Sequence, residues 1–164
     1  MVVSVGAKRV LDVGCGSGPL FEPLASRGIA VSGIDPAPAM VKLANDRAAS
    51  YSGLVSVEQK GWEQIDSVDA FDAAVALGVF DYVPNPAELL ARMGRAAPHV
   101  IGSFPAPGLR VVLRKVRYGA HGVGVYPYTA ARISELAAGS DMFVDRLVPL
   151  GRAGHLALLS RRPG

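Results

Sequence analysis

A run of glycines near the N-terminus constrains the fold of this chain more than any other feature. The stretch 10–13 is apolar except for Asp12, and Gly14, Gly16 and Gly18 follow it at alternate positions. An apolar run of this kind is typical of a buried parallel strand. Glycines allow a tight turn that other residues resist, and their bare backbone lets a ligand approach closely. The sequence therefore predicts a strand, a tight turn and a ligand site at the edge of a parallel sheet.

A second acid helps to define the ligand. The next apolar run, 31–34, leads directly into Asp35, whose carboxylate could accept hydrogen bonds from the two hydroxyls of a ribose. A dinucleotide fingerprint requires a glycine where this chain has Pro19. Asp12 would repel a pyrophosphate but could hold an ammonium group. The pattern favours a nucleoside cofactor with a cationic amino-acid end.

With these residues the chain resembles the class I S-adenosylmethionine-dependent methyltransferases. The resemblance implies that the glycine turn binds the methionine end of S-adenosyl-L-methionine, that Asp35 binds the ribose, and that S-adenosyl-L-homocysteine is the product. After the expected third strand, Trp62 replaces the acid found in many relatives, so we expect its ring to flank the adenine, with Glu63 as a second candidate. The implied cofactor-binding residues are Asp12, Gly14, Cys15, Gly16, Ser17, Gly18, Asp35, Pro36, Trp62, Glu63, Leu77, Gly78 and Val79.

The order of apolar runs predicts an α/β fold. We expect a Rossmann-like, seven-stranded, mostly parallel sheet with a C-terminal antiparallel hairpin and helices on both faces. The expected strands are 8–13, 30–34, 54–59, 71–77, 99–104, 143–150 and 155–159, and the expected helices are 19–27, 36–49, 85–97 and 129–139.

We treat the chain, 1–164, as one methyltransferase domain. Relatives usually carry helices before the first strand, whereas only about seven residues precede it here, which predicts little or no N-terminal cap. The segment 105–128 is too long for a plain connection, so we interpret it as a substrate-binding or lid insertion.

The acceptor site is expected after the fourth strand and in that insertion. The block 77–84, together with 103–105, looks most like magnesium-protoporphyrin methyltransferases and neighbouring small-molecule enzymes, which implies a small organic acceptor. It lacks the Asn/Asp-Pro-Pro-aromatic sequence expected of enzymes that methylate nucleobase amines. The candidate substrate-binding residues are Phe80, Tyr82, Arg114, Tyr118 and Tyr126.

The need for a general base depends on the acceptor atom. A carboxylate is already ionised at neutral pH, whereas a hydroxyl or an amine often needs a base. His121, between small residues of the insertion, is the candidate catalytic residue; we expect His99 and His155 to be structural or solvent-facing. The sequence leaves open which of the three acceptor groups is used.

Composition excludes several other classes. The single cysteine, Cys15, cannot form an internal disulfide and fits as a small residue within the turn. No paired spacing of histidine and cysteine predicts a metal site. The sequence shows no signal-peptide or transmembrane pattern, so we expect a cytoplasmic protein.

Charge differs between the two parts of the chain. Residues 1–100 carry 8 basic and 11 acidic side chains, whereas residues 101–164 carry 9 and 3. The basic residues around Arg114 form either a solvated face or a surface for an acidic partner, which could be a carboxylate-bearing substrate, a membrane surface or, less favoured, nucleic acid. A homodimer is left open.

Two other functions share the glycine turn. An NAD(P)-dependent oxidoreductase would keep the turn and Asp35 but would leave Asp12 unexplained. A non-catalytic cofactor-binding or partner subunit of the same fold would keep every cofactor contact. A serine hydrolase is excluded because Ser17 lacks the surrounding Gly-x-Ser-x-Gly sequence.

Overall fold

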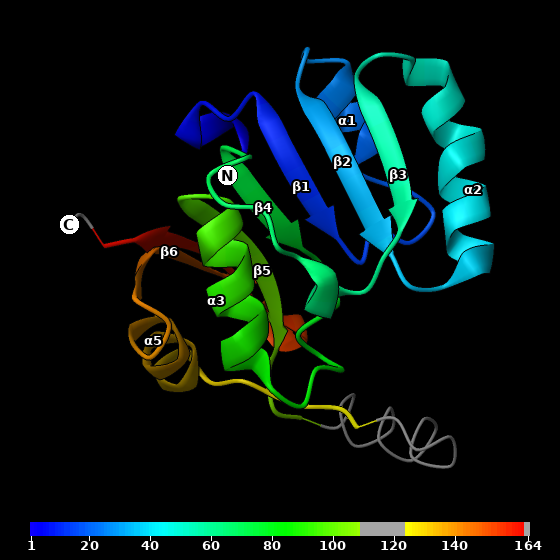
Figure 1. The fold of residues 1–164 in the computed structure, drawn as a ribbon. Coiled ribbons are helices and arrows are strands. Elements are labelled where there is room, and N and C mark those ends of the chain that lie inside the picture. The colour runs from blue at the N-terminus through cyan, green and yellow to red at the C-terminus, as the bar shows by residue number, and fades with distance from the viewer. Residues whose placement is uncertain (109–123, 163–164) are drawn as a thin grey trace.

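A computed structural model of the protein describes residues 1–108 and 124–162 and contains a seven-stranded sheet with the order β3-β2-β1-β4-β5-β7-β6 (Figure 1). The five strands β1 to β5 are parallel, and β7 pairs antiparallel with both β5 and β6. The strands are β1 (Arg9–Val13), β2 (Ala30–Asp35), β3 (Val55–Gln59), β4 (Ala73–Ala76), β5 (His99–Pro105), β6 (Met142–Pro149) and β7 (Gly154–Arg161). The predicted fold class, including the closing hairpin, is confirmed.

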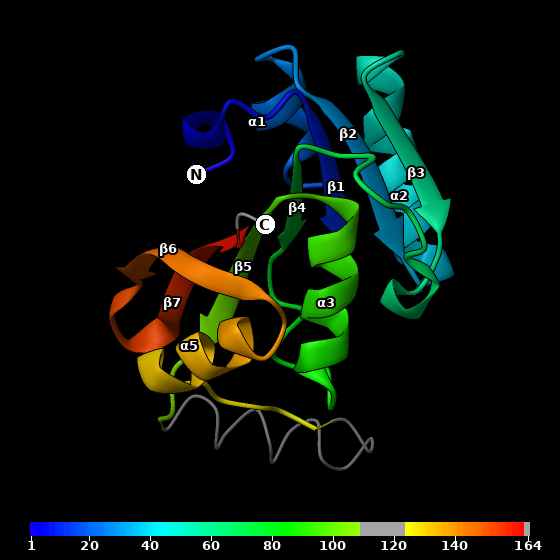
Figure 2. The ribbon, with the colours of Figure 1, turned by 60° about the vertical axis from the view of Figure 1, so that its left-hand side comes forward.

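The helices lie on both faces of the sheet, but each face is covered over a different half. Helices α1 (Phe21–Ala25) and α2 (Pro38–Ala48) lie behind β1 to β3 in Figure 1, whereas α3 (Pro86–Ala96) and α5 (Ala130–Ala138) lie in front of the other half (Figures 1 and 2). Two clusters of buried apolar side chains fill these two interfaces. Each pair of helices therefore covers one face of the sheet, over one half of its strands.

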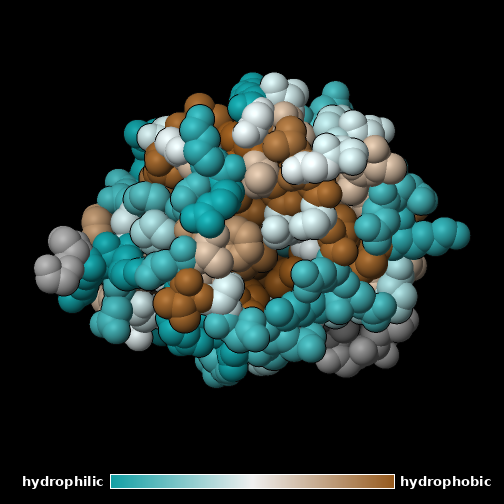
Figure 3. All heavy atoms as spheres, turned by 45° about the horizontal axis from the view of Figure 1, so that its top comes forward, coloured by the Kyte–Doolittle hydropathy of each residue, from teal (hydrophilic) through white to brown (hydrophobic). Residues whose placement is uncertain are grey.

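Short 3-10 turns complete the described elements: η1 (Val3–Val5), η2 (Ala49–Tyr51), η3 (Trp62–Gln64) and η4 (Gly151–Ala153). Between β3 and β4 the structure has only η3 and no α-helix, so no helix among the described residues covers the front of β1 to β3. Figure 3 shows the molecule with the top of the Figure 1 view tilted forward. Hydrophobic side chains are gathered there in a hollow near the middle of the surface.

Local sequence signals explain where the helices begin and where β4 ends. Asn85 accepts a hydrogen bond from the N–H of Glu88 before α3, and Thr129 accepts one from Arg132 before α5. Such caps satisfy N–H groups that have no partner within the helix. Strand β4 begins two residues later than predicted, and it ends one residue earlier because Gly78, with a φ of 75°, turns the chain at the carboxyl end.

Candidate functional site

Two of the three glycines in the turn after β1 are packed so closely that a side chain would not fit. Gly14 and Gly18 have φ values of 66° and 75°, in the left-handed region that favours glycine. A Cβ atom on Gly14 would lie 2.5 Å from Cγ2 of Val79, and one on Gly18 would lie 2.3 Å from a ring carbon of Phe21. The turn therefore lies directly against the loop after β4, and its conformation depends on glycine.

Asp35, at the carboxyl end of β2, holds this turn in place. Its Oδ2 accepts a hydrogen bond of 2.9 Å from the backbone N–H of Gly16, and its Oδ1 accepts one of 2.9 Å from Ala37. The side chain is buried, with 8% of the residue exposed. A carboxylate offers about four acceptor positions, so two remain for a ligand. Asp35 thus supports the turn and can still receive hydroxyl groups.

Asp12 lies behind the same turn, in a less favourable environment. The residue is 3% exposed, and its Oδ2 is buried without a hydrogen-bond partner among the described residues. Burial, and then the charge of Asp35, raise the pKa of the Asp12 carboxyl to about 7. A buried carboxylate is costly unless a donor or a cation accompanies it, so this position suits a positively charged ligand group.

A cavity of about 320 Å³ opens beside the turn, at the carboxyl ends of β1 to β4. Open parallel sheets bind ligands at this edge. The cavity brings together Gly14, Asp35, Pro36, Trp62, Gly78, Val79 and Tyr82, all expected in the site, and adds Val13, Lys60 and Val83. One wall is apolar and the other carries the Asp35 carboxylate and bare backbone, which is an arrangement that can hold a nucleoside.

A family profile described as a methyltransferase domain matches residues 10–98, which is more than half of the chain and includes every element that builds this cavity. The chain belongs to this methyltransferase family. The resemblance inferred from the sequence is thereby confirmed.

Curated relatives of the methyltransferase domain include two ubiquinone biosynthesis O-methyltransferases. That of Alkalilimnicola ehrlichii is 38% identical over 101 residues, which cover 58% of this chain and 41% of the relative. That of Azorhizobium caulinodans is 38% identical over 87 residues, covering 52% and 34%. The chain therefore matches less than half the length of these relatives.

Solved structures of low sequence identity share the fold of the methyltransferase domain. Magnesium protoporphyrin IX methyltransferase from Synechocystis PCC 6803, with bound S-adenosylhomocysteine, has a TM-score of 0.79 at 24% identity, covering 98% of this chain and 78% of that one. An O-methyltransferase from neocarzinostatin biosynthesis, in complex with S-adenosylhomocysteine and 1,4-dihydroxy-2-naphthoic acid, has a TM-score of 0.79 at 21% identity, covering 96% and 50%.

Some predicted cofactor residues of the methyltransferase domain lie outside the cavity lining. Gly16, Ser17 and Gly18 form the turn itself, and Glu63 is exposed on η3. The side chain of Leu77 lines a separate cleft with Leu20 and Leu156. Leu77 can therefore contribute only its backbone to the cavity.

Cys15 is buried behind the turn, and a Cβ on Gly33 would lie 3.0 Å from its sulfur. Burial, followed by the charges of Asp12 and Asp35, raises the pKa of the Cys15 thiol to about 12. A thiol held in this un-ionised form is a poor nucleophile, which agrees with its interpretation as a small residue that fills the turn.

The candidate acceptor residues are divided between the core, the surface and a part of the chain outside the described residues. Phe80 is fully buried, and its ring lies 4.5 Å from that of Phe104. It supports the loop from behind instead of forming the expected pocket wall, because the turn at Gly78 directs its side chain into the core. Tyr82 does line the cavity.

Tyr126 is 38% exposed, and its backbone N–H donates to the carbonyl oxygen of Asp81 at 2.8 Å. Residues 124–128 therefore pass beside the loop that follows β4. The other three candidates, Arg114, Tyr118 and His121, lie outside the described residues.

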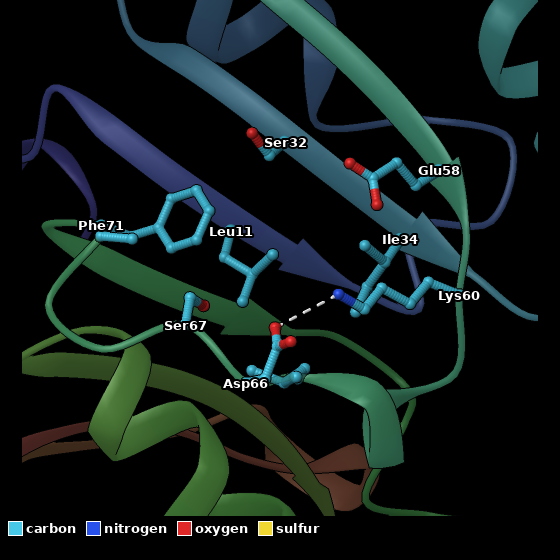
Figure 4. Close-up of a pocket in the computed structure, with 10 residues that line it drawn as sticks. Leu11, Ser32, Ile34, Glu58, Lys60, Asp66, Ser67 and Phe71 are labelled. Carbon is cyan, nitrogen blue, oxygen red and sulfur yellow. Dashed lines mark hydrogen bonds and ion pairs between the residues drawn. The ribbon is translucent and has the colours of Figure 1, made fainter.

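Sequence reasoning missed Lys60, which lies immediately after β3 in the wall of the cavity. Its backbone N–H donates to the carbonyl oxygen of Asp35 at 3.1 Å, and its Nζ lies 3.5 Å from Oδ1 of Asp66 (Figure 4). A lysine just after a strand is ordinarily solvated, so nothing in the sequence distinguished it.

Lys60 also borders a second hollow of about 220 Å³ on the open face of β1 to β3, drawn in Figure 4. We call this hollow the sheet groove. It is lined by Leu11, Ser32, Ile34, Glu58, Lys60, Ile65, Asp66, Ser67, Ala70 and Phe71.

The remaining predictions concern metals, membranes and histidines. Within residues 1–108 and 124–162, no three side chains of the His, Cys, Asp or Glu type are grouped to hold a metal ion. None of the helices in these ranges has the length and apolar character needed to span a membrane. His99 Nδ1 lies 2.8 Å from Ser160 Oγ within the sheet, which indicates a structural role.

Proposed function

We propose that this domain binds S-adenosyl-L-methionine and transfers its methyl group to a small organic acceptor. The observation that carries this proposal is a cavity lined by Gly14 of the glycine turn and by Asp35, whose carboxylate keeps free acceptor positions, with the Asp12 carboxyl buried behind the turn and its Oδ2 without a partner. A nucleoside with a cationic amino-acid end complements all three.

Each part of this ligand has a group that suits it. Asp35 would accept the ribose hydroxyls, and the glycine turn would lie along the methionine end with Asp12 facing its ammonium group. Trp62 is partly buried at the cavity wall and would flank the adenine, with Pro36 nearby. Glu63 is exposed and is the weaker of the two adenine candidates.

When bound, S-adenosyl-L-methionine supplies a methyl group that an acceptor attacks in line with the departing sulfur. The protein would chiefly align the acceptor and exclude water. Val79 and Val83 provide apolar walls for this task, and the Tyr82 hydroxyl is a polar group able to orient an acceptor. His121 remains the proposed base should the acceptor be a hydroxyl.

The relatives support an oxygen acceptor on a small molecule. Two of those named above are ubiquinone biosynthesis O-methyltransferases, and one is a magnesium protoporphyrin IX methyltransferase. The fourth is an O-methyltransferase whose structure contains 1,4-dihydroxy-2-naphthoic acid. We infer that a carboxylate or hydroxyl is methylated here. Segment 105–128 is proposed to cover this acceptor, because its end at Tyr126 is bonded to Asp81 beside Tyr82.

The proposal extends to the cell compartment and the partners. One buried, unpaired cysteine fits a reducing compartment such as the cytoplasm. A homodimer stays a hypothesis that measurement of mass in solution can test.

A binding experiment can use the single tryptophan of the chain, since Trp62 lines the cavity. Titration with S-adenosylhomocysteine should change its fluorescence saturably, and calorimetry should give one site per chain. NADH is the contrasting ligand and should give no saturable change. Folded protein that binds NADH but not S-adenosylhomocysteine would favour the oxidoreductase alternative.

Activity needs a separate experiment. Labelled methyl groups should be transferred to members of a panel of phenols and aromatic or tetrapyrrole carboxylic acids. Tight S-adenosylmethionine binding without transfer to any acceptor would instead support the non-catalytic subunit.

A further inference from the structure

The Asp12 carboxyl is left without a counter-charge by the folded domain. Of the described residues, only Asp12 and His155 have a buried side-chain nitrogen or oxygen atom without a hydrogen-bond partner. Of these two residues, Asp12 lies behind the glycine turn, and only 3% of it is exposed. An acid in this state is stable only if it is protonated or if a cation arrives.

The surroundings of Asp12 contain no described cation. On β2 it pairs with Gly33 and on β4 with Val75, which are both uncharged. The titratable groups that face it are the carboxyl of Asp35 at the end of β2 and the thiol of Cys15 in the turn. Neither group can offset a negative charge on Asp12.

The two acids differ in their hydrogen-bond partners. Asp35 accepts hydrogen bonds from the backbone N–H groups of Gly16 and Ala37, which lie against its negative charge. Asp12 has no such donor at Oδ2 and lies near that negative charge. Asp12 is therefore the acid whose negative charge the described residues leave uncompensated.

We propose that Asp12 carries a proton in the free domain and releases it to solvent when a ligand places an ammonium group at the turn. The residue then acts as a specificity determinant, because a ligand without that positive charge leaves the buried acid protonated and gains no ion pair. This inference rests on the proposed function, since it takes S-adenosylhomocysteine as the ligand.

Proton release on ligand binding breaks one bond and forms one ion pair. The O–H bond of the Asp12 carboxyl breaks, its proton passes to the buffer, and the carboxylate that remains pairs with the ligand's ammonium group. The α-amino group of the ligand stays protonated throughout, so one proton is released for each ligand bound. Raising the pH from about 6 to about 8 should consequently tighten S-adenosylhomocysteine binding about tenfold, because the proton need no longer be displaced.

Calorimetry in two buffers tests this directly. S-adenosylhomocysteine is titrated at about pH 6 in phosphate and in imidazole, whose ionisation enthalpies differ strongly. The difference in binding heat should correspond to nearly one proton released per ligand, since about nine-tenths of Asp12 is protonated one unit below its pKa. Asp12→Asn should bind more weakly and release no proton, whereas Asp46→Asn, an exposed change on α2, should behave as the wild type.

A second ligand makes the test independent of any variant. The deaminated analogue of S-adenosylhomocysteine, which keeps the nucleoside and carboxylate but lacks the amine, should bind the wild type more weakly and without proton release. Equal heats in both buffers for S-adenosylhomocysteine would overturn the inference and leave the proposed function standing. Proton release that persists in Asp12→Asn would also overturn it, and absence of binding in either buffer would overturn both.

Discussion

The cavity beside the glycine turn and the sheet groove are neighbouring hollows of comparable size, about 320 and 220 Å³, and they share Lys60 in their walls. Their charged groups differ. In the groove, Lys60 and Asp66 pair with each other and their side chains are 27% and 88% exposed, so water also stabilises them. In the cavity, Asp35 is bound to backbone N–H groups, and behind the adjoining glycine turn Asp12 is buried with no partner for its Oδ2. We propose that this buried, unsatisfied group, more than volume, distinguishes the binding site from the groove.

The largest expected effect concerns the stability of the free domain. Because the folded pKa of Asp12 is raised from 3.8 to about 7, the folded state binds more protons than the unfolded state between these values. The free energy of unfolding should therefore fall by on the order of 4 kcal/mol as the pH rises through this window, because the buried Asp12 carboxyl loses its proton. Denaturant unfolding at about pH 4.5 and pH 7.5 should show this loss for the wild type and a smaller one for Asp12→Asn. Parallel changes in the two proteins would contradict the burial argument.

Removal of the other acid should abolish much of the binding. Asp35→Ala removes the ribose acceptor and two hydrogen bonds that hold the glycine turn and the start of α2. Charge-assisted hydrogen bonds are worth roughly 1.5–3 kcal/mol, so affinity for S-adenosylhomocysteine should fall at least tenfold. The matched exposed change is Asp46→Ala. Unchanged affinity in Asp35→Ala would refute the ribose assignment.

A pair of glycine variants separates backbone strain from close packing. Gly14 and Gly53 have φ values of 66° and 82°, so alanine is strained at both. Only at Gly14 would the new Cβ meet another residue, Cγ2 of Val79 at 2.5 Å, whereas the space at Gly53 is open. Gly14→Ala should be about 1–3 kcal/mol less stable than Gly53→Ala and should bind ligand more weakly, because Val79 is pushed toward the cavity. Equal stability and affinity would show that the turn and this loop are not in contact.

The smallest effect is expected in the sheet groove. Asp66→Asn removes the ion pair with Lys60, and exposed pairs contribute about 0–1 kcal/mol. Unfolding free energy should change by less than about 1 kcal/mol, and affinity for S-adenosylhomocysteine by less than about threefold. A large loss of affinity would move the ligand from the cavity toward the groove and break the distinction between them.

Sequence reasoning succeeded where the signal is local. The glycine turn, the strand-ending acid Asp35 and the helix caps at Asn85 and Thr129 depend on neighbouring residues and on backbone geometry, and the structure has the turn and both caps as expected. The alternation of apolar runs likewise predicted a mostly parallel sheet with covering helices and a closing hairpin, because parallel strands with covering helices have few alternative arrangements.

The direction of side chains in the loops was harder to predict. After β4 the chain turns at Gly78, and each following residue faces a side that only tertiary packing decides. Phe80 consequently enters the core and Tyr82 reaches the cavity, although the sequence treats both alike. Lys60 was missed for a related reason, since its role depends on Asp66 and Trp62, which fold back beside it.

A crystal structure of the domain with S-adenosylhomocysteine would show directly whether the ligand occupies the cavity with its ammonium group at Asp12. We predict a nucleoside in the cavity beside Trp62, ribose hydroxyls within hydrogen-bond distance of Asp35, and the ammonium group close enough to Asp12 to form an ion pair. A nucleoside in the sheet groove, or a methionine end that points away from Asp12, would contradict this prediction.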